Sequence, residues 1–170
     1  MAALAIFAHG KESGPWGGKI KYLAHVATLR GYRAVSVDYT DMLSADDRVR
    51  RLLETDFGEY DRLVLAGSSM GAYVSTLASK YLRPAGLFLL APAFGLPGYN
   101  VQKPVPYAQQ TAVVMGWQDD VIPLENVASF AREHSAEYHV FADGHRLLNV
   151  LPEIGGIFDR FLERILEQAV

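Results

Sequence analysis

The stretch Gly67-Ser68-Ser69-Met70-Gly71 decides how this chain is interpreted, because of the segments on either side of it. Residues 61–67 form a short, mostly apolar run that is typical of a buried parallel strand. Residues 70–82 have the apolar spacing of a helix. A strand, a sharp turn with the pattern G-x-S-x-G and a helix together form a nucleophile elbow, which predicts an exposed hydroxyl at Ser69. The alternative is an ordinary glycine- and serine-rich loop between a strand and a helix.

Each part of this motif has a physical reason. Gly67 leaves room for the turn, and Gly71 lets the helix and the strand pack closely. Beyond the turn, Tyr73, Leu77 and Tyr81 recur at helical spacing and indicate one face of the helix. The strain of such a turn is expected to hold the serine above the sheet, at the first turn of the helix.

Length and composition exclude several classes of protein. The chain has 170 residues, of which 50% are hydrophobic and 21% charged, so we expect one ordinary globular domain over residues 1–170. A net charge of −3 gives no basic surface for nucleic acid and no polybasic anchor for a membrane. Without cysteine, the chain can form neither a disulfide nor a thiolate nucleophile.

The amino-terminal residues 1–8 are apolar but lack the charged start and the length of a signal peptide. They are better explained as a first strand that runs into His9-Gly10. No other apolar run approaches the length of a membrane span. From the sequence we expect a cytoplasmic protein with no membrane partner and no nucleic-acid partner.

Strand and helix patterns alternate along the whole chain, which predicts a three-layer α/β/α sandwich around a mainly parallel sheet of six strands. The longest irregular stretch, residues 93–110, carries three prolines and no helical period, so it predicts a flap rather than a cap. The expected strands are 4–9, 34–38, 63–67, 86–91, 112–116 and 138–141, and the expected helices are 18–30, 45–55, 70–82, 124–134 and 152–168.

With its motifs in this order, the chain resembles a small, capless member of the α/β-hydrolase superfamily. His9-Gly10 ends the first expected strand, the G-x-S-x-G turn follows the third, Gly116-Trp-Gln-Asp-Asp-Val-Ile-Pro123 follows the fifth, and Asp143-Gly-His145 follows the last. The resemblance implies a strand order of 2-1-3-4-5-6, without the two antiparallel strands that usually begin the family's sheet. It also implies a serine esterase-like activity that needs no cofactor.

Ser69 needs a general base, and the chain offers five histidines. His25 and His134 fall in expected helices, and His139 falls in the last strand. In the family, a histidine at the place of His9 shapes the oxyanion loop. His145 lies in a loop beyond the last strand, on the side where Ser69 emerges, so it is the predicted base; the alternative is an exposed loop histidine.

The imidazole in turn needs a carboxylate that fixes its tautomer. The family's G-x-x-D-x-x-[VI]-P spacing selects Asp119, and Asp120 is the neighbouring alternative. Asp38 and Asp41, after the second expected strand, are remote alternatives that turn or capping roles explain better.

An oxyanion hole would complete this machinery. The backbone N–H of Met70, next to the nucleophile, is one predicted donor, and the N–H of Lys11 is the other. The glycine-rich loop 11–18 also suggests a phosphate loop, but the Walker spacing is not met.

The remaining predicted site residues surround the nucleophile. His9 and Gly10 belong to the oxyanion loop, and Trp16, Phe94 and Trp117 lie on loops that could form a substrate pocket or could serve packing alone. The histidines scatter over different elements without metal-ligand spacing, so no metal site is predicted.

These patterns predict a serine hydrolase for small carboxylic esters or thioesters, with a shallow pocket that favours short acyl groups. An amide, a lactone or a carbon–carbon bond could be cleaved by the same three residues. A non-catalytic module that binds a protein or a small ligand is the alternative from another class. The predicted partner is a small-molecule ester or thioester, and the oligomeric state is open.

Overall fold

The structure, a computed structural model, describes residues 2–168 as six strands and five helices in the predicted alternating order. Their boundaries lie within two residues of those expected, because turns and caps fix where each apolar run ends. The strands are β1 (Ala3–Ala8), β2 (Tyr32–Val37), β3 (Arg62–Ser68), β4 (Gly86–Leu90), β5 (Gln110–Gly116) and β6 (Glu137–Phe141). The helices are α1 (Gly18–Leu29), α2 (Ala45–Glu54), α3 (Met70–Leu82), α4 (Leu124–Glu133) and α5 (Leu151–Glu167).

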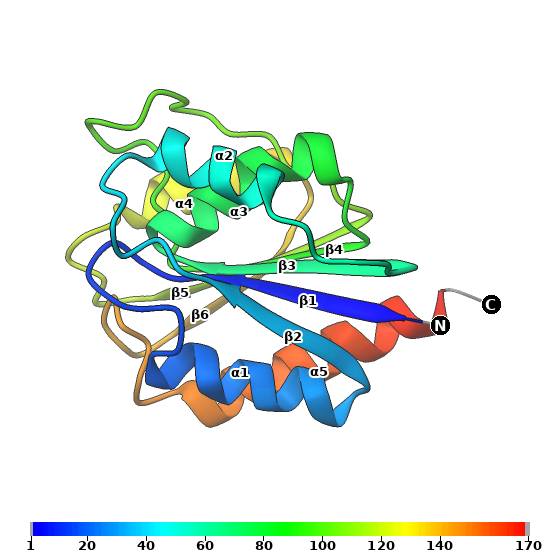
Figure 1. Cartoon of the computed structure of the whole chain (residues 1–170). Coiled ribbons are helices and arrows are strands. Elements are labelled where there is room, and N and C mark those ends of the chain that lie inside the picture. Colours follow the sequence, from blue (N-terminus) through cyan, green and yellow to red (C-terminus); the bar gives the residue numbers. More distant parts are fainter. Residues whose placement is uncertain (1, 169–170) are drawn as a thin grey trace.

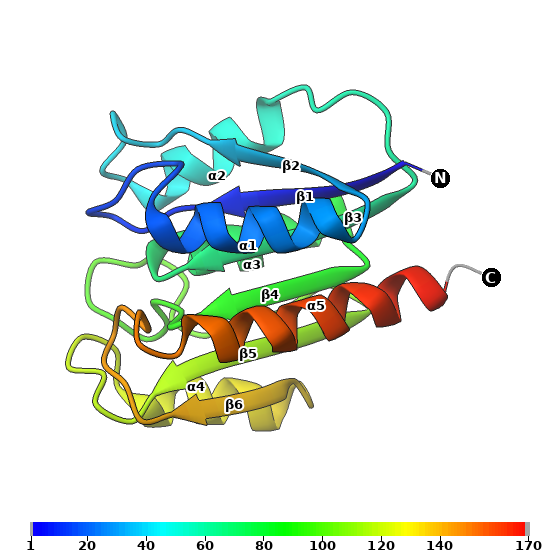
Figure 2. The same ribbon diagram turned by 90° about the horizontal axis from the view of Figure 1, so that it is seen from below.

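The strands form one sheet in the order β2-β1-β3-β4-β5-β6, which confirms the prediction. Every neighbouring pair is parallel, so all carboxyl ends meet at one edge, seen at the left of Figure 2. The direction of winding reverses between β1 and β3, and the loops that follow these two strands therefore diverge. Such a switch point opens the crevice in which α/β proteins bind ligands.

Helices cover both faces of this sheet. Figure 1 shows α1 and α5 on one face and α2, α3 and α4 on the other. Strands β1 and β4 are buried along their whole length, as expected for the centre of a sheet covered on both sides. Edge strand β6 is only partly buried. Within residues 2–168, no helix combines the length and the apolar character needed to cross a membrane.

Helix α3 lies at the centre of its layer and packs mainly through small side chains. Ala72, Thr76 and Ser79 are buried, and the hydroxyls of the latter two donate to backbone carbonyls of the same helix. Tyr73 is buried too, but Tyr81 is exposed, so the apolar stripe expected from the sequence turns away from the core. Small side chains allow α3 to approach the sheet closely, and this approach sets the position of the turn before it.

Two glycines at this turn have no room for a side chain. A Cβ on Gly71 would lie 2.0 Å from the carbonyl oxygen of Ala8, at the end of β1. A Cβ on Gly67 would lie 2.4 Å from the carbonyl oxygen of Gly71. The first turn of α3 therefore rests directly on the backbone of β1, in agreement with the packing role predicted for Gly71.

The connection from β4 to β5, residues 91–109, contains neither helix nor strand. It is fastened to the helices beside it: Tyr73 accepts a hydrogen bond at its hydroxyl from the Val101 N–H (3.0 Å), and Ser79 accepts one from the Tyr107 N–H (3.0 Å). The connection thus lies along α3 as an irregular flap.

Substituting Gly71 tests this packing. Gly71→Ala is expected to lower the free energy of unfolding by about 3 kcal/mol or more, because the new methyl group overlaps the backbone of β1. Gly156→Ala is the matched control, since its Cβ would meet nothing closer than Arg160 Nη1 at 3.7 Å. This control, within α5, should gain about 0.5–1 kcal/mol of stability. Urea unfolding measures both, and equal stability of the two variants would contradict the packing described here.

Candidate active site

Ser69 occupies a strained backbone conformation between β3 and α3. Its φ of 56° and ψ of −116° are unusual for a residue with a side chain. Such a conformation costs on the order of 1–3 kcal/mol and persists only where neighbouring structure enforces it. Here the Ser69 N–H donates to the carbonyl of Leu90 (2.9 Å), and its own carbonyl accepts from the N–H of Ala72 (3.1 Å). The serine hydroxyl is thereby held at the amino-terminal end of α3.

His145 follows β6 and reaches this hydroxyl. Its Nε2 lies 3.2 Å from Ser69 Oγ, and its Nδ1 lies 2.9 Å from Asp119 Oδ2. A carboxylate can only accept a hydrogen bond, so Nδ1 carries the imidazole proton. The lone pair on Nε2 then faces the serine, as a general base requires. The structure thus brings together the three residues predicted from distant parts of the sequence.

Asp119 is held as a buried carboxylate. Its side chain has 0% exposed surface, and its Oδ1 accepts hydrogen bonds from the N–H groups of Val121 (2.9 Å) and Ile122 (2.8 Å). Burial alone would raise the pKa of Asp119, but the hydrogen bonds from His145 and from these two amides outweigh burial and lower it. Asp120, the alternative from the sequence, is exposed, and it is Asp119 that bonds His145.

The loop that carries His145 is braced by Asp143. Its Oδ1 accepts from the Gly144 N–H and its Oδ2 from the Asn149 N–H, both at 2.8 Å, and these bonds span the histidine. Burial would raise the pKa of Asp143, but these hydrogen bonds lower it overall. At the end of β5, a Cβ on Gly116 would lie 2.2 Å from the Asp143 carbonyl oxygen, so only glycine allows this loop to approach β5. Buried Leu147, at a φ of 55°, closes the loop over the core.

Lys19, in the first turn of α1, fixes the same loop from the other side. Its Nζ donates to the carbonyl of Arg146, the residue after His145, at 3.0 Å. Burial and, to a smaller extent, the charge of Arg146 lower the pKa of Lys19 to about 8, against the opposing effect of Asp119 and Asp143. From the sequence, Asp143 was named only as part of the motif that ends in His145 and was given no role of its own, and Lys19 was not a predicted site residue. Only Asp143 carried a signal, because an Asp-Gly pair is typical of a turn.

The two predicted oxyanion donors lie beside Ser69. The N–H of Met70 belongs to the first turn of α3, where backbone donors have no partner within the helix. A Cβ on Gly10 would lie 3.7 Å from Ser69 Cβ, which places the Gly10–Lys11 peptide against the nucleophile. Over residues 2–168, neither the Met70 N–H nor the Lys11 N–H donates to a backbone carbonyl. Both groups are thus free for a ligand.

Lys11 and Met70 also line a cavity of about 260 Å³ at the carboxyl edge of the sheet. One wall is the amino-terminal turn of α2, and the other is the flap near Tyr99. The walls are tied together where Asn100 Nδ2 donates to Asp46 Oδ2 at 2.5 Å. Polar and apolar side chains both line this cavity, and its volume suits a small substituent of a substrate.

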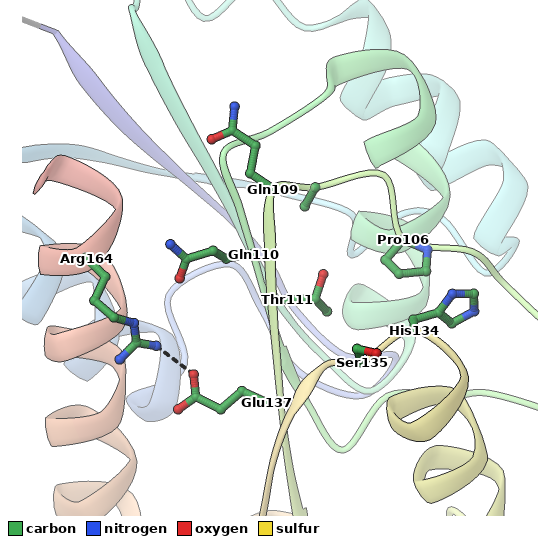
Figure 3. Close-up of a pocket in the computed structure, with 9 residues that line it drawn as sticks. Pro106, Gln109, Gln110, Thr111, His134, Ser135, Glu137 and Arg164 are labelled. Carbon is green, nitrogen blue, oxygen red and sulfur yellow. Dashed lines mark hydrogen bonds and ion pairs between the residues drawn. The ribbon is translucent and has the colours of Figure 1, made fainter. Parts of the chain in front are cut away.

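A larger hollow of about 380 Å³ lies at the opposite edge of the sheet, where β5 and β6 begin (Figure 3). Its Arg164 is paired with Glu137 at 2.6 Å and points across the hollow toward it. Ser69, Asp119 and His145 line neither this hollow nor the smaller cavity, but the smaller cavity is lined by Met70, the residue next to Ser69. The smaller cavity is the candidate substrate pocket because it contains the predicted oxyanion donors.

The predicted contacts of His9 and Phe94 with substrate are corrected by the structure. His9 is fully buried, and both ring nitrogens are used: Nε2 accepts from the Tyr39 N–H (2.9 Å), and Nδ1 donates to the Gly10 carbonyl (2.8 Å). Burial lowers the pKa of His9, so the ring stays neutral as a brace of the loop. Phe94 is 1% exposed, with its ring centroid 4.6 Å from that of Phe130. An apolar ring on this loop is buried in the core because burial removes it from water.

The two tryptophans behave differently. Trp16, on the loop after β1, is 46% exposed, and Trp117, directly after β5, is 60% exposed. Both belong to loops at the carboxyl edge, on which Ser69 and His145 also lie. Their contact with a substrate stays a prediction.

Fold and site geometry together define the class of α/β hydrolases, with a serine at the elbow and a histidine after the last strand. The sequence profile of the alpha/beta hydrolase family matches residues 5–164. The chain belongs to this family. No curated protein matches it.

Solved structures agree with this assignment. A protein from Xanthomonas campestris pv. campestris, assigned to the α/β superfamily of hydrolases, is 32% identical over 95% of this chain and 99% of its own, with a TM-score of 0.83. Est1E from Butyrivibrio proteoclasticus is 16% identical over 98% of this chain and 89% of its own, with a TM-score of 0.78. A further X. campestris protein, a serine hydrolase without a lid, is 22% identical over 95% of this chain and 81% of its own, with a TM-score of 0.67. The last two show similarity of fold alone.

Substituting the two neighbouring aspartates tests the role of the carboxylate. Asp119→Asn should lower kcat by about 10³–10⁴-fold, because an amide that donates to Nδ1 leaves the proton on Nε2 and removes the base. Asp120→Asn should keep kcat close to that of the wild-type protein, since this side chain is exposed. Steady-state hydrolysis of an activated ester measures both. A reversed pattern would assign the carboxylate role to Asp120.

Proposed function

We propose that the protein is a serine hydrolase that cleaves small carboxylic esters or thioesters. The observation that carries this proposal is the continuous chain of hydrogen bonds from Ser69 through His145 to Asp119, with distances of 3.2 and 2.9 Å. This geometry pairs a half-buried serine with a correctly oriented base. Membership of the α/β hydrolase family supports the same reaction class.

In the first half of the proposed reaction, Ser69 Oγ attacks the carbonyl carbon while His145 Nε2 takes its proton. The carbonyl oxygen becomes an oxyanion, which the N–H groups of Met70 and Lys11 stabilise. When the tetrahedral intermediate collapses, the bond to the leaving alcohol or thiol breaks. His145 gives the proton to that leaving group, and the acyl group remains on Ser69.

In the second half, water occupies the place of the leaving group. His145 Nε2 takes one proton from water as its oxygen attacks the acyl carbon. Collapse of the second tetrahedral intermediate breaks the bond to Ser69 Oγ, and the proton on His145 returns to the serine. Buried Asp119 stays ionised throughout, because hydrogen bonds hold its pKa low, and it stabilises the imidazolium in both halves.

Covalent labelling tests the nucleophile directly. A fluorophosphonate should add one group to Ser69 of the native protein, because its phosphorus captures an activated serine and its oxygen occupies the oxyanion hole. Intact mass and peptide mapping locate the adduct. Ser69→Ala should abolish both labelling and turnover, whereas Ser68→Ala, the adjacent control, should retain labelling. Labelling at Ser68, or none on folded wild-type protein, would contradict the proposal.

Acyl chain length tests the pocket. The cavity of about 260 Å³ beside Lys11 and Met70 should accept acetyl to butyryl groups and leave longer chains in water. Each methylene left outside forgoes about 0.8 kcal/mol of burial. Values of kcat/KM for p-nitrophenyl acetate and butyrate should therefore exceed those for the octanoate and palmitate. An optimum at octanoate or longer would mean that the flap encloses an acyl tunnel, and the small-ester assignment would fall.

A further inference from the structure

The most unusual buried side chain of the molecule is Arg48, on α2. It is 1% exposed, and none of the ion pairs among residues 2–168 includes it. Its guanidinium instead lies 5.4 Å from the ring centroid of Tyr39, and burial lowers its pKa. A buried positive charge without a carboxylate partner is costly, so its contacts are informative.

Arg48 donates only to backbone carbonyls, and two of them belong to the loop beside the nucleophile. Its Nη1 lies 3.1 Å from the His9 oxygen and 3.3 Å from the Gly10 oxygen. Its Nε donates to the Met42 oxygen at 3.1 Å. The Gly10 oxygen also accepts from His9 Nδ1 at 2.8 Å. Two side-chain donors, one of them charged, therefore converge on the Gly10 carbonyl.

The Gly10 carbonyl and the Lys11 N–H belong to the same peptide unit. This unit is planar and trans, since no cis peptide is present, and its C=O and N–H point in opposite directions. Because Arg48 and His9 hold the Gly10 oxygen on their side of the peptide, the Lys11 N–H is held pointing away from these two side chains. Gly10 lies against Ser69, and Lys11 lines the cavity that it shares with Met70.

Charge adds a second effect. A charged donor on a carbonyl oxygen draws electron density through the peptide and strengthens the N–H at its other end as a donor. In the described part of the chain no carboxylate pairs with the buried guanidinium, so its field reaches an anion at the Lys11 N–H with little screening.

We propose that Arg48 is a positioning residue that holds and polarises the Gly10–Lys11 peptide, so that the Lys11 N–H stabilises the oxyanion. This inference rests on the proposed function, because it assigns a residue to that reaction. It also explains why a charge is buried at this place on α2: packing and backbone contacts alone could be supplied by a neutral side chain, which would avoid the desolvation of a charge.

The test compares two arginines of one helix. Arg48→Met keeps the apolar volume but removes the donors and the charge, and it should lower kcat by about 10²-fold, as loss of one oxyanion donor does. KM for p-nitrophenyl acetate should change by less than about threefold, because the oxyanion exists only in the transition state. The rate of fluorophosphonate labelling should fall in parallel with kcat.

Arg51→Met is the matched control. Arg51 lies one turn further along α2, and its guanidinium bonds Asp41 and the Asp38 carbonyl at the surface. This variant should keep kcat and the labelling rate of the wild-type protein. Urea unfolding shows whether each variant is folded at the assay temperature. A folded Arg48→Met protein with wild-type kcat, or one altered in KM alone, would overturn the inference.

Two further measurements apply if Arg48→Met does not fold. Arg48→Lys retains the positive charge but not the several N–H donors of the guanidinium. Its kcat should lie between those of the wild-type protein and Arg48→Met, with an unchanged KM. A change in KM alone would contradict the positioning role. In the wild-type protein, the amide proton of Lys11 should move downfield in nuclear magnetic resonance spectra when Ser69 is phosphonylated. An unmoved resonance would overturn the inference, whereas wild-type protein that neither reacts with the probe nor cleaves esters would overturn the proposed function itself.

Discussion

The contact between the first turn of α3 and the end of β1 is the constraint on which the position of Ser69 depends. Gly71 rests on the backbone of Ala8, and the chain turns from β3 into α3 through a positive φ at Ser69. The same contact places the end of β1, and therefore the Gly10–Lys11 peptide, beside the serine. One close approach of two backbones thus brings Ser69 and the predicted oxyanion donors together, and the hydrogen bonds described above hold them there.

Much of the fold follows from local patterns in the sequence. The central strands are continuous apolar runs, which is the pattern of a sheet covered on both faces, and the order of motifs gives the topology. The residues that meet at the site could also be selected in advance. Ser69, Asp119 and His145 lie directly after strands, and the carboxyl ends of parallel strands meet at one edge. Periodicity and connectivity, together with the resemblance to the family's motifs, were sufficient for this part.

The remainder depends on contacts that no local pattern records. Phe94 was expected near the pocket because its loop reaches the site, yet its ring is buried against Phe130 on α4, 36 residues away in the sequence. In the sequence, Arg48 looks like an ordinary polar residue within a helix, and Lys19 looks like an ordinary polar residue in the first turn of one. Their importance comes from the carbonyls that they reach in other elements, at Gly10 and Arg146. Such partners become visible only when the loops are placed in space.

The flap from β4 to β5 has a consequence for how a substrate would be selected. It is fastened to α3 at Tyr73 and Ser79, and to α2 through Asn100, before any ligand arrives. A lid that closes over its ligand spends part of the binding energy on ordering itself, and it can adapt to ligands of different shape. A flap that is already hydrogen-bonded to its neighbours loses no binding energy to ordering, and it does not adapt its shape to the ligand. Discrimination between substrates would then be rigid and would change through single side chains of the wall, so that new specificities could be reached by point substitutions without redesign of a moving part.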